Sequence, residues 1–294
     1  MKYEDEDLEE EKKEKAMRWF KTICNPDFQL IDSLVTLFID NRAQPELCKK
    51  ILKILKKFNE YLPELVGDQF FNNLKFPQAL VNYLEKTELQ DMSGDAFILL
   101  INIFDENSTP ELISIEFIKK LTGSLEYIED EGTLDSLISI LVCLLPVFEK
   151  KSDDPSNIEL NPILKEFVTR EDLYREKLLH LTNRGALYRL DKCCKTINIM
   201  LSKEDIGNYY FNINDLNLLM DILLREATTN TNPKTRIQIL KLIEVILDNE
   251  IYREHKHRMQ DVEEMVQECI LYEEEESQEK KYGDAELECI ATLN

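Results

Sequence analysis

The clearest candidates for chemistry in this chain are its three histidines, and their spacing argues against a shared site. His255 and His257 form an H-K-H run that could suggest a metal ligand pair. On a helix, residues i and i+2 project about 200° apart, so the two imidazoles could not share one ion. We therefore interpret the pair as a solvated helix surface. His180 lies in the apolar run L-L-H-L, where a hydrogen-bonded, partly buried side chain is a more frequent role than general base.

The seven cysteines are the second group with reactive side chains. Their number is odd, no C-x-x-C pair occurs, and most lie in leucine-rich stretches where a thiol packs as a small hydrophobic group. Cys193 and Cys194 are adjacent, which leaves a redox role open. Adjacent helical residues point about 100° apart, so we expect one buried and one exposed thiol. The cysteine usage favours a reducing, cytosolic compartment.

Motifs for nucleotide binding or acyl transfer do not occur in the sequence. It contains no G-x-x-x-x-G-K-[ST], no G-x-G-x-x-G and no G-x-S-x-G. With seven glycines, the chain has little from which to build loops that cradle phosphate. We therefore expect a protein that is not an enzyme, with no catalytic residues, no cofactor, no bound metal and no small-molecule substrate.

The net charge of −22 narrows the class of partner. Residues 1–15 contribute −4 and residues 273–288 contribute −6; subtracting both from −22 leaves −12 for the rest of the chain. Affinity for a phosphate backbone comes from Lys and Arg that displace counterions. Nucleic acid and anionic membranes are therefore not expected partners, whereas a protein with basic surfaces is.

One helical segment goes against this acidic balance. Five lysines decorate its polar face: Lys49, Lys50, Lys53, Lys56 and Lys57. A solvated face without a partner is the simpler interpretation of such a run. The alternative is a docking surface for an acidic patch on another protein. We retain Lys49, Lys53 and Lys57 as candidate partner-binding residues.

Two polar turns supply the other candidates. In the structural interpretation, Gly185 stops a helix, and Asn214 or Asp215 caps the next helix by accepting a hydrogen bond from a free backbone N–H. In the alternative interpretation, the same polar side chains contact a partner protein. The candidate partner-binding residues of these turns and of the following helix are Asn183, Arg184, Asn214, Asp215 and Arg225.

Helices must position all of these residues, because apolar side chains recur at helical spacing and only 7 Gly and 9 Pro interrupt the chain. Apolar stripes cover residues 30–38, 47–58, 97–104, 112–121 and 134–148, and further helices are expected at 186–201, 215–227, 234–248 and 259–272. Each helix is too apolar on one side to stand alone. We predict an all-α, armadillo/HEAT-like helical solenoid with degenerate repeats, and a globular helical bundle is the structural alternative.

The same pattern divides the chain into one helical domain between two acidic tails. We expect flexible tails at residues 1–15 and 273–294, and an armadillo-like leucine-rich domain at residues 16–272. The polar residues 150–157 are expected to form an inter-helix loop. No uninterrupted run of about 18 apolar residues predicts a transmembrane helix. The acidic N-terminus lacks the apolar region of a signal peptide.

The most informative run covers residues 208–226 and reads N-Y-Y-F-N-I-N-D-L-N-L-L-M-D-I-L-L-R-E. A polar, aromatic turn leads into an amphipathic helix. The run resembles the signature segment of the WISH/DIP/SPIN family, which reads roughly F-Y-T-N-D-L, then a leucine helix that contains D-I and ends in R plus a polar residue. Asn212 and Ile213 depart from it, since the family usually has tyrosine and threonine there.

Two further motifs follow the family order. Residues 178–185, L-L-H-L-T-N-R-G, are similar to the family's L-L-x-L-L-N-R-G. Residues 236–252 are similar to a family helix that ends in a D-N-x-x-Y turn. Together the three motifs agree with the family in order and spacing over roughly residues 95–272.

The resemblance implies a non-enzymatic activator of the actin-related protein 2/3 complex. Such proteins bind the complex without a preformed filament and start linear actin filaments that seed branched networks, for example at endocytic actin patches. It therefore implies a cytoplasmic protein of the cortical actin cytoskeleton. The SH3 domain of animal members is not found in the sequence, which favours a fungal-type member. The acidic C-terminal segment contains no tryptophan, so delivery of actin monomers is not the expected mechanism.

Two other functions stay open at this point. A generic armadillo or HEAT scaffold or cargo adaptor would use a concave face to bind an extended peptide. An importin-like groove would show repeated Trp and Asn, and a single Trp argues against it. A helical enzyme would need a cluster of titratable groups, which the sequence does not indicate.

Overall fold

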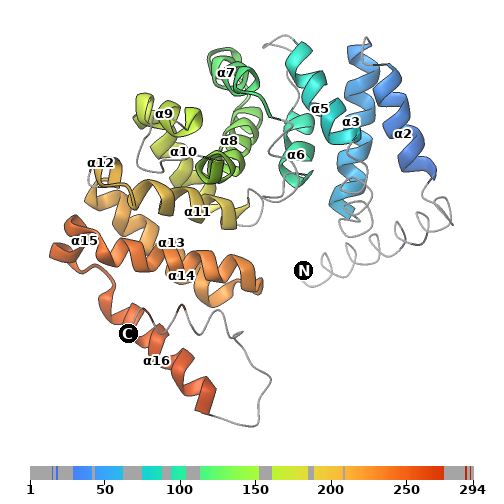
Figure 1. Ribbon diagram of the computed structural model, residues 1–294. Helices are drawn as coiled ribbons and strands as arrows, with labels where there is room; N and C mark the ends of the chain where they lie inside the picture. The colour runs from blue at the N-terminus through green and yellow to red at the C-terminus, as the bar shows by residue number, and fades with distance from the viewer. Residues whose placement is uncertain are drawn as a thin grey trace. The chain divides into compact units, whose positions relative to one another are not determined.

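The computed structural model describes residues 29–41, 44–61, 75–87, 94–103, 113–151, 161–184, 189–207 and 209–274, with single residues 15, 18, 289 and 292. Every regular element in these ranges is a helix, and they contain no strand (Figure 1). The all-α prediction is confirmed. The solenoid arrangement and the domain boundaries stay predictions, and most residues of both expected tails lie outside the described ranges.

The chain divides into two compact units, Met1–Leu137 and Ile138–Asn294. The first unit contains α2 (Gln29–Asp40), α3 (Pro45–Tyr61), α5 (Lys75–Lys86), α6 (Gly94–Ile103), α7 (Ile115–Ser124), the 3-10 helix η3 (Leu125–Tyr127) and the start of α8 (Glu131–Lys151). The second unit contains the rest of α8, α9 (Pro162–Thr169), α10 (Glu171–Asn183), α11 (Leu190–Leu201), α12 (Glu204–Gly207), α13 (Ile213–Thr229), α14 (Pro233–Asp248), α15 (Glu250–His255) and α16 (Met259–Glu274).

Helix boundaries follow caps that the apolar stripes do not reveal. The stripe 112–121 becomes a helix only from Ile115, because the side chain of Ser114 accepts a hydrogen bond from the N–H of Phe117 at 3.0 Å. The expected helix 234–248 and the D-N-x-x-Y turn at its end are confirmed. Helix α14 ends at Asp248, and the next residue caps α15. The short helices α5, α9 and α12 were not predicted.

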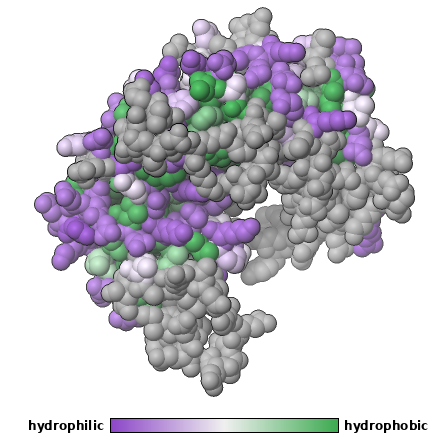
Figure 2. Space-filling model, in the orientation of Figure 1, coloured by the Kyte–Doolittle hydropathy of each residue, from purple (hydrophilic) through white to green (hydrophobic). Residues whose placement is uncertain are grey.

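In the first unit, apolar faces of α2, α3, α5 and α6 form the core. Phe38 of α2 packs edge-on against Phe76 and Tyr83 of α5, with ring centroids 5.9 and 5.4 Å apart. Helix α3 buries Cys48, Ile51, Leu52 and Leu55. These are the positions that a helical stripe predicts. On the face drawn in Figure 2, hydrophilic residues cover much of the described surface, and apolar residues form separate patches.

Helix α8 combines a length of 21 residues with a largely apolar composition. Its segment Glu131–Glu149 could cross a membrane on these two criteria, which the sequence analysis did not anticipate. However, 72% of that segment is buried inside the protein. A buried core helix meets the same criteria, so the finding is weak evidence for a membrane span. Helix α8 also continues to Lys151, into the segment that we expected to be a loop; residues 152–160 lie outside the described ranges.

In the second unit, polar bonds join helices that lie about 40 residues apart in the sequence. The side-chain amide of Asn198 in α11 donates to the carbonyl of Lys241 in α14 at 3.1 Å. The amide of Asn249, the residue that caps α15, donates to the carbonyl of Gly207 in α12 at 3.0 Å. The two bonds span 43 and 42 residues. Figure 1 shows α11, α13 and α14 side by side, in agreement with their packing contacts.

Candidate functional site

Helices α10 and α13 carry four of the candidate residues, and two polar contacts hold these helices together. Near the C-terminal ends of the two helices, the guanidinium of Arg225 donates to Oδ1 of Asn183 at 3.2 Å and to the carbonyl oxygen of Asn183 at 3.3 Å. Asn183 is the last residue of α10, so Arg225 satisfies a carbonyl that the helix itself leaves unpaired. Arg184 follows, exposed, as the C-cap. Gly185, the expected helix stop, lies outside the described residues.

Near the N-terminal ends of α10 and α13, Arg175 also joins the two helices. The sequence analysis missed this contact. Nη1 of Arg175 donates to the carbonyl of Tyr210 at 3.3 Å, and its Nε lies 3.6 Å from Oδ2 of Asp215. Arg175 stands near the start of α10, and Asp215 near the start of α13. Since Asn183 and Arg225 meet near the other ends, the two helices run in the same direction. The only local signal was the i,i+4 spacing of Glu171 and Arg175, which form an ion pair.

The entrance of α13 is a capping box, and the capping residue differs from the prediction. Oδ1 of Asn212 accepts hydrogen bonds from the N–H groups of Asn214 and Asp215 at 2.9 and 3.1 Å. In return, Oδ2 of Asp215 accepts from the N–H of Asn212 at 3.1 Å. The prediction that Asn214 caps the helix was therefore wrong, and Asp215 acts from the third helical position. The side chain of Asn214 is exposed.

Replacing this cap should cost stability without changing the surface chemistry of α13. Asn212→Ala removes the acceptor for two N–H groups and is expected to lower the free energy of unfolding by about 1 kcal/mol. Chemical denaturation followed by circular dichroism measures the change. Asn214→Ala is the matched control, since it leaves both bonds to Oδ1 of Asn212 in place. Equal unfolding midpoints for the two variants would contradict the assignment of Asn212 as the cap.

The aromatic turn before α13 is anchored by two buried rings. Tyr210 is 3% exposed, Phe211 is fully buried, and their ring centroids lie 5.0 Å apart at 67°. The hydroxyl of Tyr210 donates to the carbonyl of Phe167 in α9 at 3.3 Å. Burial raises the pKa of Tyr210, and the charge of Glu171 adds to this effect, so the phenol stays a neutral donor. The turn is therefore fixed to both α9 and α10.

Asp221, in the middle of α13, ties the turn between α15 and α16 to this helix. Its Oδ1 accepts from Nε of Arg258 at 2.8 Å and lies 3.0 Å from Nε2 of His257. The hydrogen bond from Arg258 is the main reason that the pKa of Asp221 lies below its usual range, and His257 contributes further. The hydroxyl of Tyr252 donates to the carbonyl of His257. Burial raises the pKa of Tyr252 to about 12, so this donor keeps its proton at neutral pH.

Comparison with known protein families identifies this part of the chain. Residues 130–262 match the family model described as SPIN90/Ldb17, leucine-rich domain. This segment is similar to a SPIN90/Ldb17 leucine-rich domain. The resemblance to the WISH/DIP/SPIN family is thereby confirmed, over a narrower range than residues 95–272. The domain family is linked to actin-related functions. No curated protein matches the chain.

Both polar contacts between α10 and α13 lie inside the SPIN90/Ldb17 domain, whereas the three candidate lysines lie outside it. Lys53 and Lys57 are exposed, and Lys49 is half-buried. Lys49 pairs with Glu46 at 3.3 Å, and Lys57 pairs with Glu60 at 2.6 Å. Acidic groups of the same helix therefore neutralise part of this positive face. A docking role for these lysines stays a prediction.

The pair His255 and His257 differs from the expected solvated helix face. Helix α15 ends at His255, and Lys256 and Arg258 both have left-handed backbone, with φ of 51° and 56°. The two histidines are therefore not on one helix. His255 is exposed as expected, but His257 is half-buried against Asp221. The sequence analysis missed the contact between His257 and Asp221 because the two residues lie 36 positions apart in the chain.

The contact at Asp221 predicts a dependence of stability on pH. A lowered pKa in the folded state stabilises the fold above the unfolded pKa of about 3.8, and this stabilisation is lost as pH falls through the folded value. Because the carboxylate is 43% exposed, its contribution should stay below about 1 kcal/mol. Asp221→Asn should therefore lower the melting temperature at pH 7 and differ less from wild type at pH 3. Asp248→Asn, at the exposed pair with Arg253, is the control. A constant difference between Asp221→Asn and wild type across pH would contradict this role.

The cysteines of α11 also depart from the prediction. Cys193 and Cys194 are both buried, so the expected exposed thiol does not exist. The reason is that helices pack on several sides of α11, which leaves neither direction open. Burial raises the pKa of both thiols and therefore suppresses the reactive thiolate. The redox interpretation loses its physical basis.

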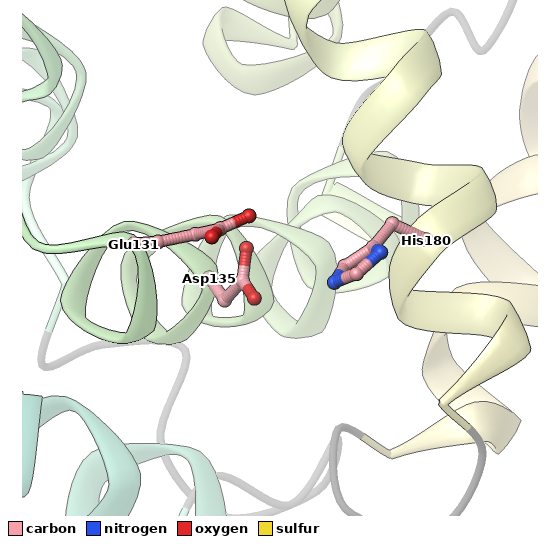
Figure 3. Close-up of side chains that lie close together, drawn as sticks. All are labelled: Glu131, Asp135 and His180. Carbon is pink, nitrogen blue, oxygen red and sulfur yellow. The ribbon is translucent and has the colours of Figure 1, made fainter.

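Figure 3 shows three side chains whose types could bind a metal, Glu131 and Asp135 of α8 and His180 of α10. The two carboxylates stand on successive turns of one helix; Glu131 is exposed and Asp135 is buried. They belong to the first unit, whereas His180 belongs to the second. We therefore assign no joint metal site to them. His180 is partly buried, as its apolar sequence context predicted.

Proposed function

We propose that this protein is a non-enzymatic activator of the actin-related protein 2/3 complex that starts linear actin filaments without a preformed filament. The match of residues 130–262 to the SPIN90/Ldb17 leucine-rich domain carries the proposal, because that family is linked to actin-related functions. The chain would act in the cytoplasm, at cortical actin such as endocytic patches. There its linear filaments would seed branched networks.

We propose an armadillo-like array for the second unit, and the sequence spacing of the bonds between its helices supports it. Helices α10, α11 and α12 correspond in order to α13, α14 and α15. Bonds between corresponding helices join residues 42 or 43 positions apart, within the period of roughly 40–47 residues that HEAT and armadillo repeats have. Stacked repeats share one continuous core and present a long, stiff surface. Such a surface suits binding to a large protein partner.

The proposed mechanism is a shift in the population of two states of the complex. A rigid helical surface would bind the active arrangement of the two actin-related subunits more tightly than the inactive one. Moving this equilibrium from about 1:99 to about 99:1 needs roughly 5.5 kcal/mol of differential binding, which one interface of standard size can supply. The net charge of −22 supports a partner surface that is basic where it meets this chain.

Direct binding to the purified complex tests the proposal. The full chain, immobilised on resin, should retain the actin-related protein 2/3 complex from a pure solution at near-physiological salt. An unrelated protein of similar size and net charge is the control for non-specific attraction to acidic surfaces. If the chain retains no more complex than this control does, the proposed function fails.

A further inference from the structure

Tyr209 is an aromatic residue that the fold holds out in solvent. Its side chain is 80% exposed, more than that of any other exposed large hydrophobic residue in the described ranges. The next two residues, Tyr210 and Phe211, are buried. The three aromatic residues of this turn therefore have different roles. Two anchor the turn, and the packing among the described residues gives no reason for the third.

The backbone that carries Tyr209 is fixed on both sides. The N–H groups of Tyr209 and Tyr210 both donate to the carbonyl of Ile206, at 3.0 and 2.9 Å. On one side, Asn249 of the α15 cap holds the carbonyl of Gly207. On the other side, Arg175 holds the carbonyl of Tyr210. A partner that binds this ring would not have to order the backbone, which lowers the entropic cost of association.

Acidic groups outnumber basic ones around the turn, with Glu171, Asp172 and Asp205 against Arg175. Asp205, in the preceding helix α12, is exposed. Glu171 and Asp172 both pair with Arg175, and the side chain of Asp172 remains 95% exposed. Their charges reach the turn, since both affect the titration of Tyr210. A surface that accepts this turn must therefore offer Lys or Arg around the site of the ring.

We propose that Tyr209 is an anchor of the protein interface and inserts into an apolar pocket with a basic rim on the partner. Tyrosine is enriched among the few residues that supply most of the energy of an interface, because it buries a large ring and loses few rotamers. The inference rests on the proposed function, since the partner is taken to be the actin-related protein 2/3 complex. The inference adds to that function the residue that makes the contact, Tyr209, and the chemistry of the partner surface that receives it.

Tyr209→Ala tests the anchor in the full chain. The melting temperature should change by less than about 2 °C, because an exposed side chain is removed. Affinity for the purified complex, measured by binding to the labelled complex, should fall at least about tenfold. The matched control is Tyr127→Ala, at another exposed tyrosine (56%) in the first unit. Its affinity should equal that of wild type.

The basic rim is tested separately with Asp205→Lys. The variant should bind several-fold more weakly at low salt, and the difference should shrink as salt screens the charges. Equal binding of Asp205→Lys and wild type at low salt would contradict the rim.

Four outcomes separate the hypotheses. If wild type does not bind the purified complex, the proposed function fails and the anchor fails with it. If wild type binds and Tyr209→Ala binds equally well, only the anchor fails. If Tyr209→Ala and Tyr127→Ala weaken binding to the same degree, the specific role of Tyr209 is wrong. A loss confined to Tyr209→Ala, with unchanged melting, supports the proposal.

Discussion

Added to purified actin-related protein 2/3 complex and monomeric actin, without filaments and without a Wiskott–Aldrich-type factor, the protein is expected to shorten the lag before polymerisation. The lag reflects slow nucleation, and a protein that stabilises the active arrangement of the complex raises the number of nuclei. Because the proposed function starts filaments without a preformed filament, the first filaments should be linear. Fluorescence microscopy should find the complex at the slow-growing end of each filament.

Two controls make this prediction decisive. Without the complex, the protein should leave the lag unchanged, because the proposed activity acts through the complex. With a Wiskott–Aldrich-type factor added, branches should appear on the linear filaments. If the protein binds the complex but the lag keeps its full length, the activator hypothesis is wrong. The generic scaffold then takes its place.

Gly207→Ala is expected to destabilise the second unit strongly, by at least about 3 kcal/mol. A Cβ at this position would lie 2.2 Å from the carbonyl oxygen of Leu201 and 3.0 Å from its carbon. Both are backbone atoms, so no rotation of a side chain can relieve the clash. Relief requires the end of α11 or α12 to move. That movement would disturb the bonds from Asn249 to the carbonyl of Gly207 and from the N–H of Gly207 to Lys203.

Gly123→Ala is the matched control for this substitution. Gly123 lies inside α7, and a Cβ there would meet nothing within 4 Å. Alanine should stabilise that helix by about 0.5–1 kcal/mol, because it loses less conformational entropy on folding. Thermal unfolding followed by circular dichroism measures both changes. Gly207→Ala with wild-type melting would show that the close approach to Leu201 does not constrain the fold.

The helices were predictable because a helix is specified mainly by local pattern. In α13, Leu216, Leu219, Met220 and Leu223 recur at helical spacing, and all four are buried as their stripe requires. The expected range 215–227 lies within the observed Ile213–Thr229. The motif from residue 208 onward also indicated the family, which the match of residues 130–262 confirmed. Short helices such as α12 escaped prediction because four residues carry too little periodicity.

Capping could have been assigned from the sequence, but two neighbouring polar residues competed for the role. The run N-I-N-D has a capping residue at Asn212 and an acid three positions later, which is the pattern of a capping box. We placed the cap two or three residues later, at Asn214 or Asp215. The error follows from the start of the apolar stripe, because the first apolar residue of a helix need not be its first residue.

Sequence alone predicted an acidic, all-helical chain that resembles the SPIN90/Ldb17 leucine-rich domain, since composition, periodicity and motif order are properties of neighbouring residues. Only the tertiary structure decided which side chains are free to act. It paired Arg225 with Asn183 and His257 with Asp221, and it buried Cys193 and Cys194 together. It also buried Tyr210 and left Tyr209 exposed. The physical reason is that a pattern shows which face of a helix is apolar, whereas the partner of a polar group depends on residues about 40 positions away that packing brings beside it.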